Sequence, residues 1–209
     1  MYSVKEIFYT LQGEGARAGR PAVFCRFSGC NLWNGLESGR NDAVCKFCDT
    51  DFVGVDGVLG GKFNNPELLS NQINELWPTG KGYKYVVLTG GEPLLQVDTK
   101  LINALHTHNF EVAVETNGTI VAPDGIDWLC VSPKSGSKWL QQKGNELKLV
   151  FPQPLLMPEI VENADFNDFY LQPMDGPNQE INTQKSITYC QINPKWKLSI
   201  QTHKVINIK

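Results

Sequence analysis

Six short apolar runs, each followed by a Gly, Pro or Asn signal, constrain the fold most strongly. Between the first three runs, segments 66–77 and 99–108 carry apolar residues at helical spacing. Runs that are apolar on both faces and alternate with helices are typical of a parallel sheet covered by helices. The predicted strands are 22–29, 85–91, 110–118, 128–134, 146–151 and 169–174.

The length narrows this class further. A complete eight-unit barrel takes roughly 250 residues, and this chain has 209. We therefore predict an α/β fold, a partial, open (β/α) barrel of about six parallel strands that forms a single domain over residues 1–209. Only a weak helical stretch at 156–164 separates the later strands, so the helices are reduced in the C-terminal half. We also expect a helix over 178–195 and an edge strand over 196–203.

Composition and charge limit the partners. No apolar run approaches the roughly 18–20 residues that a membrane-spanning helix needs. Lys and Arg number 19 and Asp and Glu 22, so the net charge of −3 attracts neither nucleic acid nor an anionic membrane as a whole. The first residues do not show the pattern of a secretory signal. We expect a cytoplasmic protein whose six cysteines are reduced.

Three cysteines are the strongest chemical signal. Cys30, Cys45 and Cys48 follow the first predicted strand in the pattern C-x14-C-x2-C, within an irregular stretch, 30–62, that exceeds ordinary loops. A C-x2-C pair on a tight turn directs two sulfurs at one metal centre, and both zinc and an iron–sulfur cluster fit this spacing. Three thiolates on a four-iron cluster would leave one iron open to a substrate or cofactor.

A structural zinc site with four cysteines requires Cys25 as well. Strand alternation argues against it, because Phe24 and Arg26 share one face of the predicted strand and Cys25 lies on the other. We predict that Cys25, Cys130 and Cys190 are buried small hydrophobic residues. The spacing alone still leaves zinc open beside iron–sulfur.

Two motifs together carry a resemblance. The three-cysteine loop, with Phe47 before its last cysteine, and TGGEP (89–93) after the next strand resemble the radical S-adenosylmethionine superfamily. Within it, the chain is similar nearly end to end to the 7-carboxy-7-deazaguanine synthase family. The shared features are LQGEG (11–15), the x14 insert, Cys48-Asp49-Thr50, ETNG (115–118), SPK (132–134), QPMD (172–175) and QTHK (201–204).

This resemblance implies an activity. Members are carbon–nitrogen lyases that convert 6-carboxy-5,6,7,8-tetrahydropterin to 7-carboxy-7-deazaguanine with loss of ammonia, in queuosine-type deazapurine synthesis. The implied cofactors are a 4Fe–4S cluster, S-adenosylmethionine and Mg²⁺. The expected partners are the pterin, a reducing electron donor of the flavodoxin type and a second copy in a homodimer.

The resemblance also assigns residues to the cofactors. It implies that Cys30, Cys45 and Cys48 hold the cluster and that Thr50 binds Mg²⁺, although Thr50 alone would be read as an ordinary loop residue. Gly90 and Gly91 lack side chains that would block a close backbone approach. The implied S-adenosylmethionine-binding residues are Gly90, Gly91, Glu115, Thr116, Asn117, Ser132, Pro133, Lys134, Gln172, Pro173, Met174 and Asp175.

The substrate's carboxylate calls for a cation. Arg26, on the interior strand face, can donate a two-pronged hydrogen bond to it, and a salt bridge within the protein is the alternative. The other implied substrate-binding residues are Leu11, Gln12, Gly13, Glu14, Thr89, His203 and Lys209. At Lys209 we expect the main-chain carboxylate, and not the side chain, to accept hydrogen bonds from the pterin. We expect Val205, Ile206 and Ile208 to anchor this segment on the barrel.

Two other classes compete with this interpretation. One is a radical activating enzyme for a protein partner, which usually carries the shorter C-x3-C-x2-C loop. The other is a zinc-stabilised binding module, which would be colourless.

Overall fold

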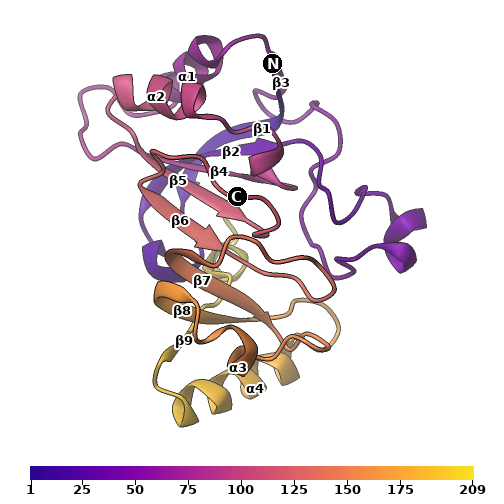
Figure 1. The fold of residues 1–209 in the computed structure, drawn as a ribbon. Helices are drawn as coiled ribbons and strands as arrows, with labels where there is room; N and C mark the ends of the chain where they lie inside the picture. Colours follow the sequence, from indigo (N-terminus) through magenta and orange to yellow (C-terminus); the bar gives the residue numbers. More distant parts are fainter.

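One mixed sheet of nine strands organises the computed structural model, which describes residues 1–209 (Figure 1). Its order is β3-β1-β2-β4-β5-β6-β7-β8-β9, so the sheet is open, as predicted. Neighbouring strands from β2 to β9 pair in parallel, whereas β1 is antiparallel to β2 and β3. The strands are β1 (Tyr2–Leu11), β2 (Pro21–Phe27), β3 (Gly61–Phe63), β4 (Tyr85–Gly90), β5 (Glu111–Thr116), β6 (Trp128–Val131), β7 (Lys143–Phe151), β8 (Asp165–Pro173) and β9 (Trp196–Leu198).

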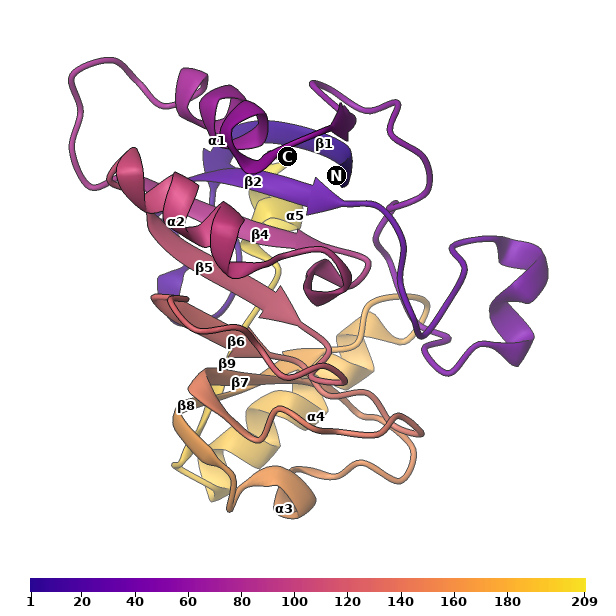
Figure 2. The ribbon, with the colours of Figure 1, turned by 45° about the horizontal axis from the view of Figure 1, so that its top comes forward.

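The helices are unevenly distributed over the sheet. Helices α1 and α2 lie side by side near β1, β4 and β5, whereas α4 packs against β8 and β9 (Figures 1 and 2). Only the single turn α3 connects β7 to β8, which confirms the predicted reduction of helices in the C-terminal half. No helix is long and apolar enough to cross a membrane. The α-helices are α1 (Pro66–Glu75), α2 (Thr99–Thr107), α3 (Pro158–Val161), α4 (Gln179–Ile192) and α5 (Thr202–Ile206).

Strand alternation in β2 separates the core from the interior of the open barrel. Val23, Cys25 and Phe27 are fully buried in the hydrophobic core. Phe24 and Arg26 lie on the opposite face and line a cavity inside the barrel. This confirms the predicted parity, and it places Cys25 away from the three-cysteine loop.

Strand β1 is the largest element that the sequence did not reveal. Its pairing with β2 shifts register between Val4 and Glu6, so its apolar side chains do not alternate regularly. Lys5, at this irregularity, donates to the carbonyl oxygen of Val53 and pairs with Asp51 and Asp56. The N-terminal strand therefore holds the segment that follows the cysteines.

The C-terminal segment departs from the prediction. Only Trp196–Leu198 form the edge strand, β9, and the chain then turns into the short helix α5. The expectation that Val205, Ile206 and Ile208 anchor the segment is wrong, because they are 73%, 51% and 36% exposed. Polar contacts hold it instead, and the Thr202 amide donates to the carbonyl oxygen of Gly13.

Candidate active site

A cavity of about 350 Å³ opens at the carboxyl ends of the parallel strands, the usual position of a site in such folds. All the residues that the sequence assigned to a site line it except Pro133 and Met174. The predicted cluster residues and the predicted substrate residues thus share one chamber. Its apolar walls include Phe8, Phe24, Leu32, Trp33 and Phe52.

The three cysteines lie on one side of this cavity. Cys30 follows β2, and its sulfur accepts a hydrogen bond from the Leu32 amide at 3.4 Å. Contact with Cys45 lowers the pKa of Cys48 to about 6, against the opposing effect of burial. The same contact, followed by burial, raises the pKa of Cys45.

A cation that sequence reasoning missed shapes the cysteine loop. The Arg40 guanidinium donates to the carbonyl oxygens of Lys46 and Cys48 at 2.9 and 3.1 Å. It also lies 4.0 Å from the centre of the Trp33 ring and pairs with Glu37. These contacts stabilise the backbone conformation around Cys45 and Cys48, in a loop that has few secondary-structure hydrogen bonds of its own.

The donor set fits an iron–sulfur cluster. No three His, Cys, Asp or Glu side chains lie close enough together to hold a single metal ion. Cys30, Cys45 and Cys48 nevertheless share one cavity wall, and a four-iron cluster spreads its thiolates more widely than one ion does. Cys25 lies in the core, and Cys130 also lines the cavity but donates a hydrogen bond to Glu146.

The TGGEP segment joins the ends of β2, β4 and β5. A Cβ on Gly90 would lie 2.3 Å from the Phe27 carbonyl oxygen, and one on Gly91 would lie 2.1 Å from that of Gly29. The glycines are therefore required by the neighbouring backbone, in addition to any approach of a cofactor. The buried Glu92 accepts hydrogen bonds from the Leu94 and Asn117 amides and the Thr116 hydroxyl.

The other predicted cofactor residues end β5, β6 and β8. The side-chain amide of Asn117 donates to Oδ1 of Asn31 at 3.0 Å, which connects the end of β5 to the cysteine loop. Burial lowers the pKa of Lys134, whose ammonium donates to the carbonyl and hydroxyl oxygens of Ser132, both at 2.6 Å. Gln172 accepts a hydrogen bond from the Ser199 hydroxyl at 3.2 Å.

Arg26 faces the cavity but is not free of partners. Its Nε lies 3.0 Å from Oε1 of Glu6, the residue opposite it in the β1–β2 register. Glu6 also pairs with the Lys209 ammonium at 2.5 Å. The internal salt bridge thus exists, but it engages only Nε. The guanidinium also lies 6.0 Å from the centre of the Phe8 ring, and its two terminal nitrogens form no hydrogen bond within the protein.

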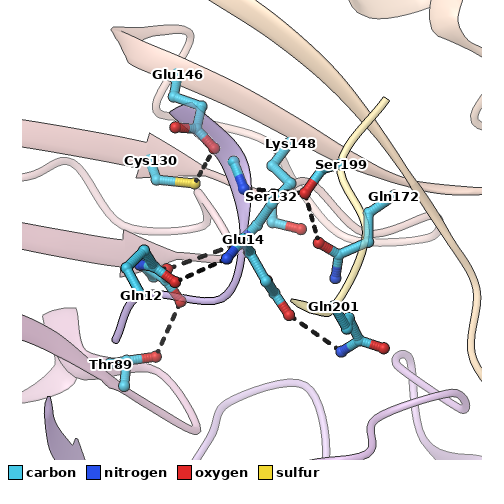
Figure 3. Close-up of polar contacts among 12 residues, drawn as sticks. Gln12, Glu14, Thr89, Cys130, Ser132, Glu146, Lys148, Gln172, Ser199 and Gln201 are labelled. Atoms are coloured by element: carbon cyan, nitrogen blue, oxygen red, sulfur yellow. Dashed lines mark hydrogen bonds and ion pairs between the residues drawn. The ribbon is translucent and has the colours of Figure 1, made fainter. Parts of the chain in front are cut away.

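A network of buried polar groups forms the floor of the cavity (Figure 3). Glu115, predicted to bind cofactor, accepts hydrogen bonds from Gln12 at 3.0 Å and Thr89 at 3.4 Å, both predicted substrate residues. Lys148, which sequence reasoning missed, lies 2.5 Å from Glu14 and 3.6 Å from Glu115. Glu115 is thus in contact with two residues that the sequence analysis assigned to the substrate.

Helix α5 and the residues before it close one side of the cavity. The His203 ring packs directly on Gly13, where an added Cβ would lie 2.3 Å from Nδ1. Lys204 pairs with Asp49 at 2.5 Å and Asp175 at 2.6 Å. The sequence analysis assigned no role to Lys204 itself, although Lys204 belongs to the QTHK motif (201–204) that contributed to the family resemblance. The C-terminal segment thus joins the cysteine loop to the end of β8.

The fold and this site define a radical S-adenosylmethionine enzyme, and the Radical SAM superfamily model matches residues 40–138. The chain is 60% identical over 208 residues to the 7-carboxy-7-deazaguanine synthase of Bradyrhizobium diazoefficiens, covering 100% of this chain and 99% of the relative. It is 56% identical over 207 residues to that of Burkholderia multivorans, covering 99% of both. The chain belongs to the 7-carboxy-7-deazaguanine synthase family.

A solved structure agrees with this assignment. The crystal structure of QueE from Escherichia coli matches with a TM-score of 0.71 and 26% identity, covering 97% of this chain and 94% of that one. Family membership favours the iron–sulfur alternative over zinc, which the cysteine spacing alone left open.

Proposed function

We propose that this enzyme converts 6-carboxy-5,6,7,8-tetrahydropterin to 7-carboxy-7-deazaguanine with release of ammonia, a step toward deazapurine nucleosides. The observation that carries the proposal is one cavity lined both by three thiols and by the charged groups Arg26, Glu14 and Glu115. A radical formed beside the thiols would meet a ligand bound by these charged groups without leaving the chamber.

The protein's contribution is to hold both reactants and exclude water. Cys30, Cys45 and Cys48 would hold the cluster, and the ends of β4, β5, β6 and β8 would bind S-adenosylmethionine. When bound, these two groups supply the radical that removes a hydrogen atom from the pterin. The apolar side chains that line the cavity would limit the access of water to this radical.

The pterin's two ends match the two kinds of polar group in the other half of the cavity. The free nitrogens of Arg26 would donate to its carboxylate. Glu14 and Glu115 would accept hydrogen bonds from its amino and ring N–H groups, supported by the backbone of Leu11 and Gly13. Thr89 and His203 would complete the contacts.

Anaerobic reconstitution tests the proposal directly. Enzyme reconstituted with iron and sulfide, then reduced with S-adenosylmethionine and the carboxytetrahydropterin present, should release 7-carboxy-7-deazaguanine and ammonia in equal amounts. The matched comparison is the tetrahydropterin without its carboxylate, which should react poorly because Arg26 has nothing to bind. Cleavage of S-adenosylmethionine with the carboxytetrahydropterin left unchanged would contradict the assigned substrate.

We further propose that Thr50 shares a Mg²⁺ with the substrate. Thr50 lines the cavity two residues after Cys48, and Mg²⁺ takes its remaining oxygen ligands from water and substrate. Thr50→Ala should lower kcat/KM roughly 10- to 100-fold and abolish its dependence on added Mg²⁺. Thr50→Ser, which keeps the hydroxyl, should retain that dependence, and an unaltered magnesium response in Thr50→Ala would place the ligand elsewhere.

A reducing, flavodoxin-like electron donor, a homodimeric assembly and a cytoplasmic location complete the proposal. Six free cysteines suit a compartment that keeps thiols reduced. Cys30 and Cys48 are half-buried, so an electron donor bound at the surface would approach the cluster loop closely.

A further inference from the structure

Lys148 is a buried cation that the proposed function leaves without a role. It lies on β7 between Leu147 and Leu149, which point into the core, while its own side chain points into the cavity. Only 6% of that side chain is exposed. Burying an ammonium is costly unless it is paired, so its partners indicate why it is there.

Two carboxylates from distant parts of the chain meet at this ammonium. Its Nζ lies 2.5 Å from Oε2 of Glu14, in the loop after β1, and 3.6 Å from Oε1 of Glu115, at the end of β5. The free oxygen of Glu14 accepts a hydrogen bond from Gln201 at 3.0 Å. Each carboxylate is therefore held by more than one partner, and Lys148 is the partner that Glu14 and Glu115 share.

The charges around Lys148 favour its ionised form. Burial pushes the pKa of Lys148 down, but attraction to Glu115 and Glu14 outweighs burial and raises the pKa well above its usual value. Cys130 on β6 and Glu146 on β7 also face it, and burial raises the pKa of Glu146. Two further titratable side chains lie near this group, Lys134 beside Lys148 and His203 beside Glu14.

The same pairing controls Glu14. Burial alone would raise its pKa, whereas Lys148 and the hydrogen bond from Gln201 bring it below the usual range. Without the ammonium, Glu14 would therefore take up a proton at a higher pH. A protonated carboxyl presents an O–H donor where the ionised group presents an acceptor.

We propose that Lys148 is a positioning residue that holds Glu14 and Glu115 as a fixed pair of carboxylate acceptors for the N–H groups of the pterin. This inference rests on the proposed function and deepens it. A pair of carboxylate acceptors selects a ring edge rich in N–H donors and disfavours a ligand that presents carbonyl oxygens there. Lys148 thus contributes to specificity by fixing the charge of the groups around the ligand.

The experiment compares Lys148→Met with Lys148→Arg in the reconstituted enzyme. Lys148→Met should lower kcat/KM about 100-fold and weaken binding of oxidised 6-carboxypterin, measured by equilibrium dialysis, because the acceptor pair loses its geometry and charge. The acid limb of the kcat/KM profile should move to higher pH. Binding of S-adenosylmethionine should not change, and Lys148→Arg should restore the acid limb.

Lys143→Met is the matched control, because Lys143 lies on the same strand, is exposed and does not line the cavity. It should behave as wild type. If Lys148→Met does not fold, the double variant Glu115→Gln/Lys148→Met replaces it, since it removes one charge of each sign. Wild-type pterin affinity and an unmoved acid limb in whichever variant folds would overturn the inference.

The wild-type arm separates this inference from the proposed function. If wild type neither binds nor converts the carboxytetrahydropterin, the proposed function fails and the role of Lys148 fails with it. If wild type converts it and the Lys148 variants match wild type, only the role of Lys148 is overturned.

Discussion

Alanine in place of Cys30, Cys45 or Cys48 is expected to abolish both cleavage of S-adenosylmethionine and product formation. The three thiols line one cavity, whereas Cys25 is buried in the core and Cys130 donates to Glu146, so we expect neither to substitute for a missing ligand. A four-iron cluster held by only two thiolates would be lost or converted to a smaller species. Iron and acid-labile sulfide, assayed after anaerobic reconstitution, should each fall from about four per chain.

Cys190→Ala is the control for this experiment. Cys190 is a half-buried free thiol that does not line the cavity, so its removal should leave the iron and sulfide content unchanged. Stoichiometric zinc with no sulfide and no visible absorption in the wild-type protein would contradict the cluster and return the zinc-site alternative to consideration.

The predictable part of this fold and site depends on regular patterns. Helical spacing over 66–77 and 99–108 identifies α1 and α2, and the side chains of Asn65 and Asp98 cap the first turns of these helices. Period-two alternation places Arg26 in the barrel and Cys25 in the core. The cysteine spacing and the glycine pair come from local chain geometry, which a sequence displays directly.

The missed elements depend on irregular or long-range contacts. The register shift between Val4 and Glu6 breaks the alternation that would have revealed β1. Helix α5 is one short turn held by Lys204, which pairs with residues from two other segments, and such contacts leave no periodic pattern.

Lys148 did leave a signal. Lys148 lies between Leu147 and Leu149, so it is a charged residue in an otherwise apolar strand, as Arg26 is. The alternation of side chains along the strand places it inside the barrel. Its partners could not be predicted, because Glu14 and Glu115 reach it only when β1 and β5 are in place.

Arg26→Ala is expected to weaken pterin binding by about 2–5 kcal/mol, since it removes the cation proposed to pair with a buried carboxylate. The lower bound corresponds to roughly 30-fold in Kd. The fold should tolerate the change, because Glu6 keeps the Lys209 ammonium at 2.5 Å. Burial raises the pKa of Glu6, but its hydrogen bonds with Lys209 and Arg26 bring that pKa below the usual value. In Arg26→Ala the hydrogen bond with Lys209 remains.

Arg20→Ala is a closely matched control for Arg26→Ala. Arg20 pairs with Glu111 at 2.5 Å, and its side chain is 23% exposed against 21% for Arg26, but it does not line the cavity. Any loss that comes only from breaking an Arg–Glu pair should appear in both variants, whereas loss of pterin affinity should appear in Arg26→Ala alone. Arg26→Lys should recover part of that affinity, because it restores the charge without the two-pronged geometry. If Arg26→Ala instead weakens S-adenosylmethionine binding as much as pterin binding, Arg26 supports the barrel as a whole and the substrate's carboxylate binds elsewhere.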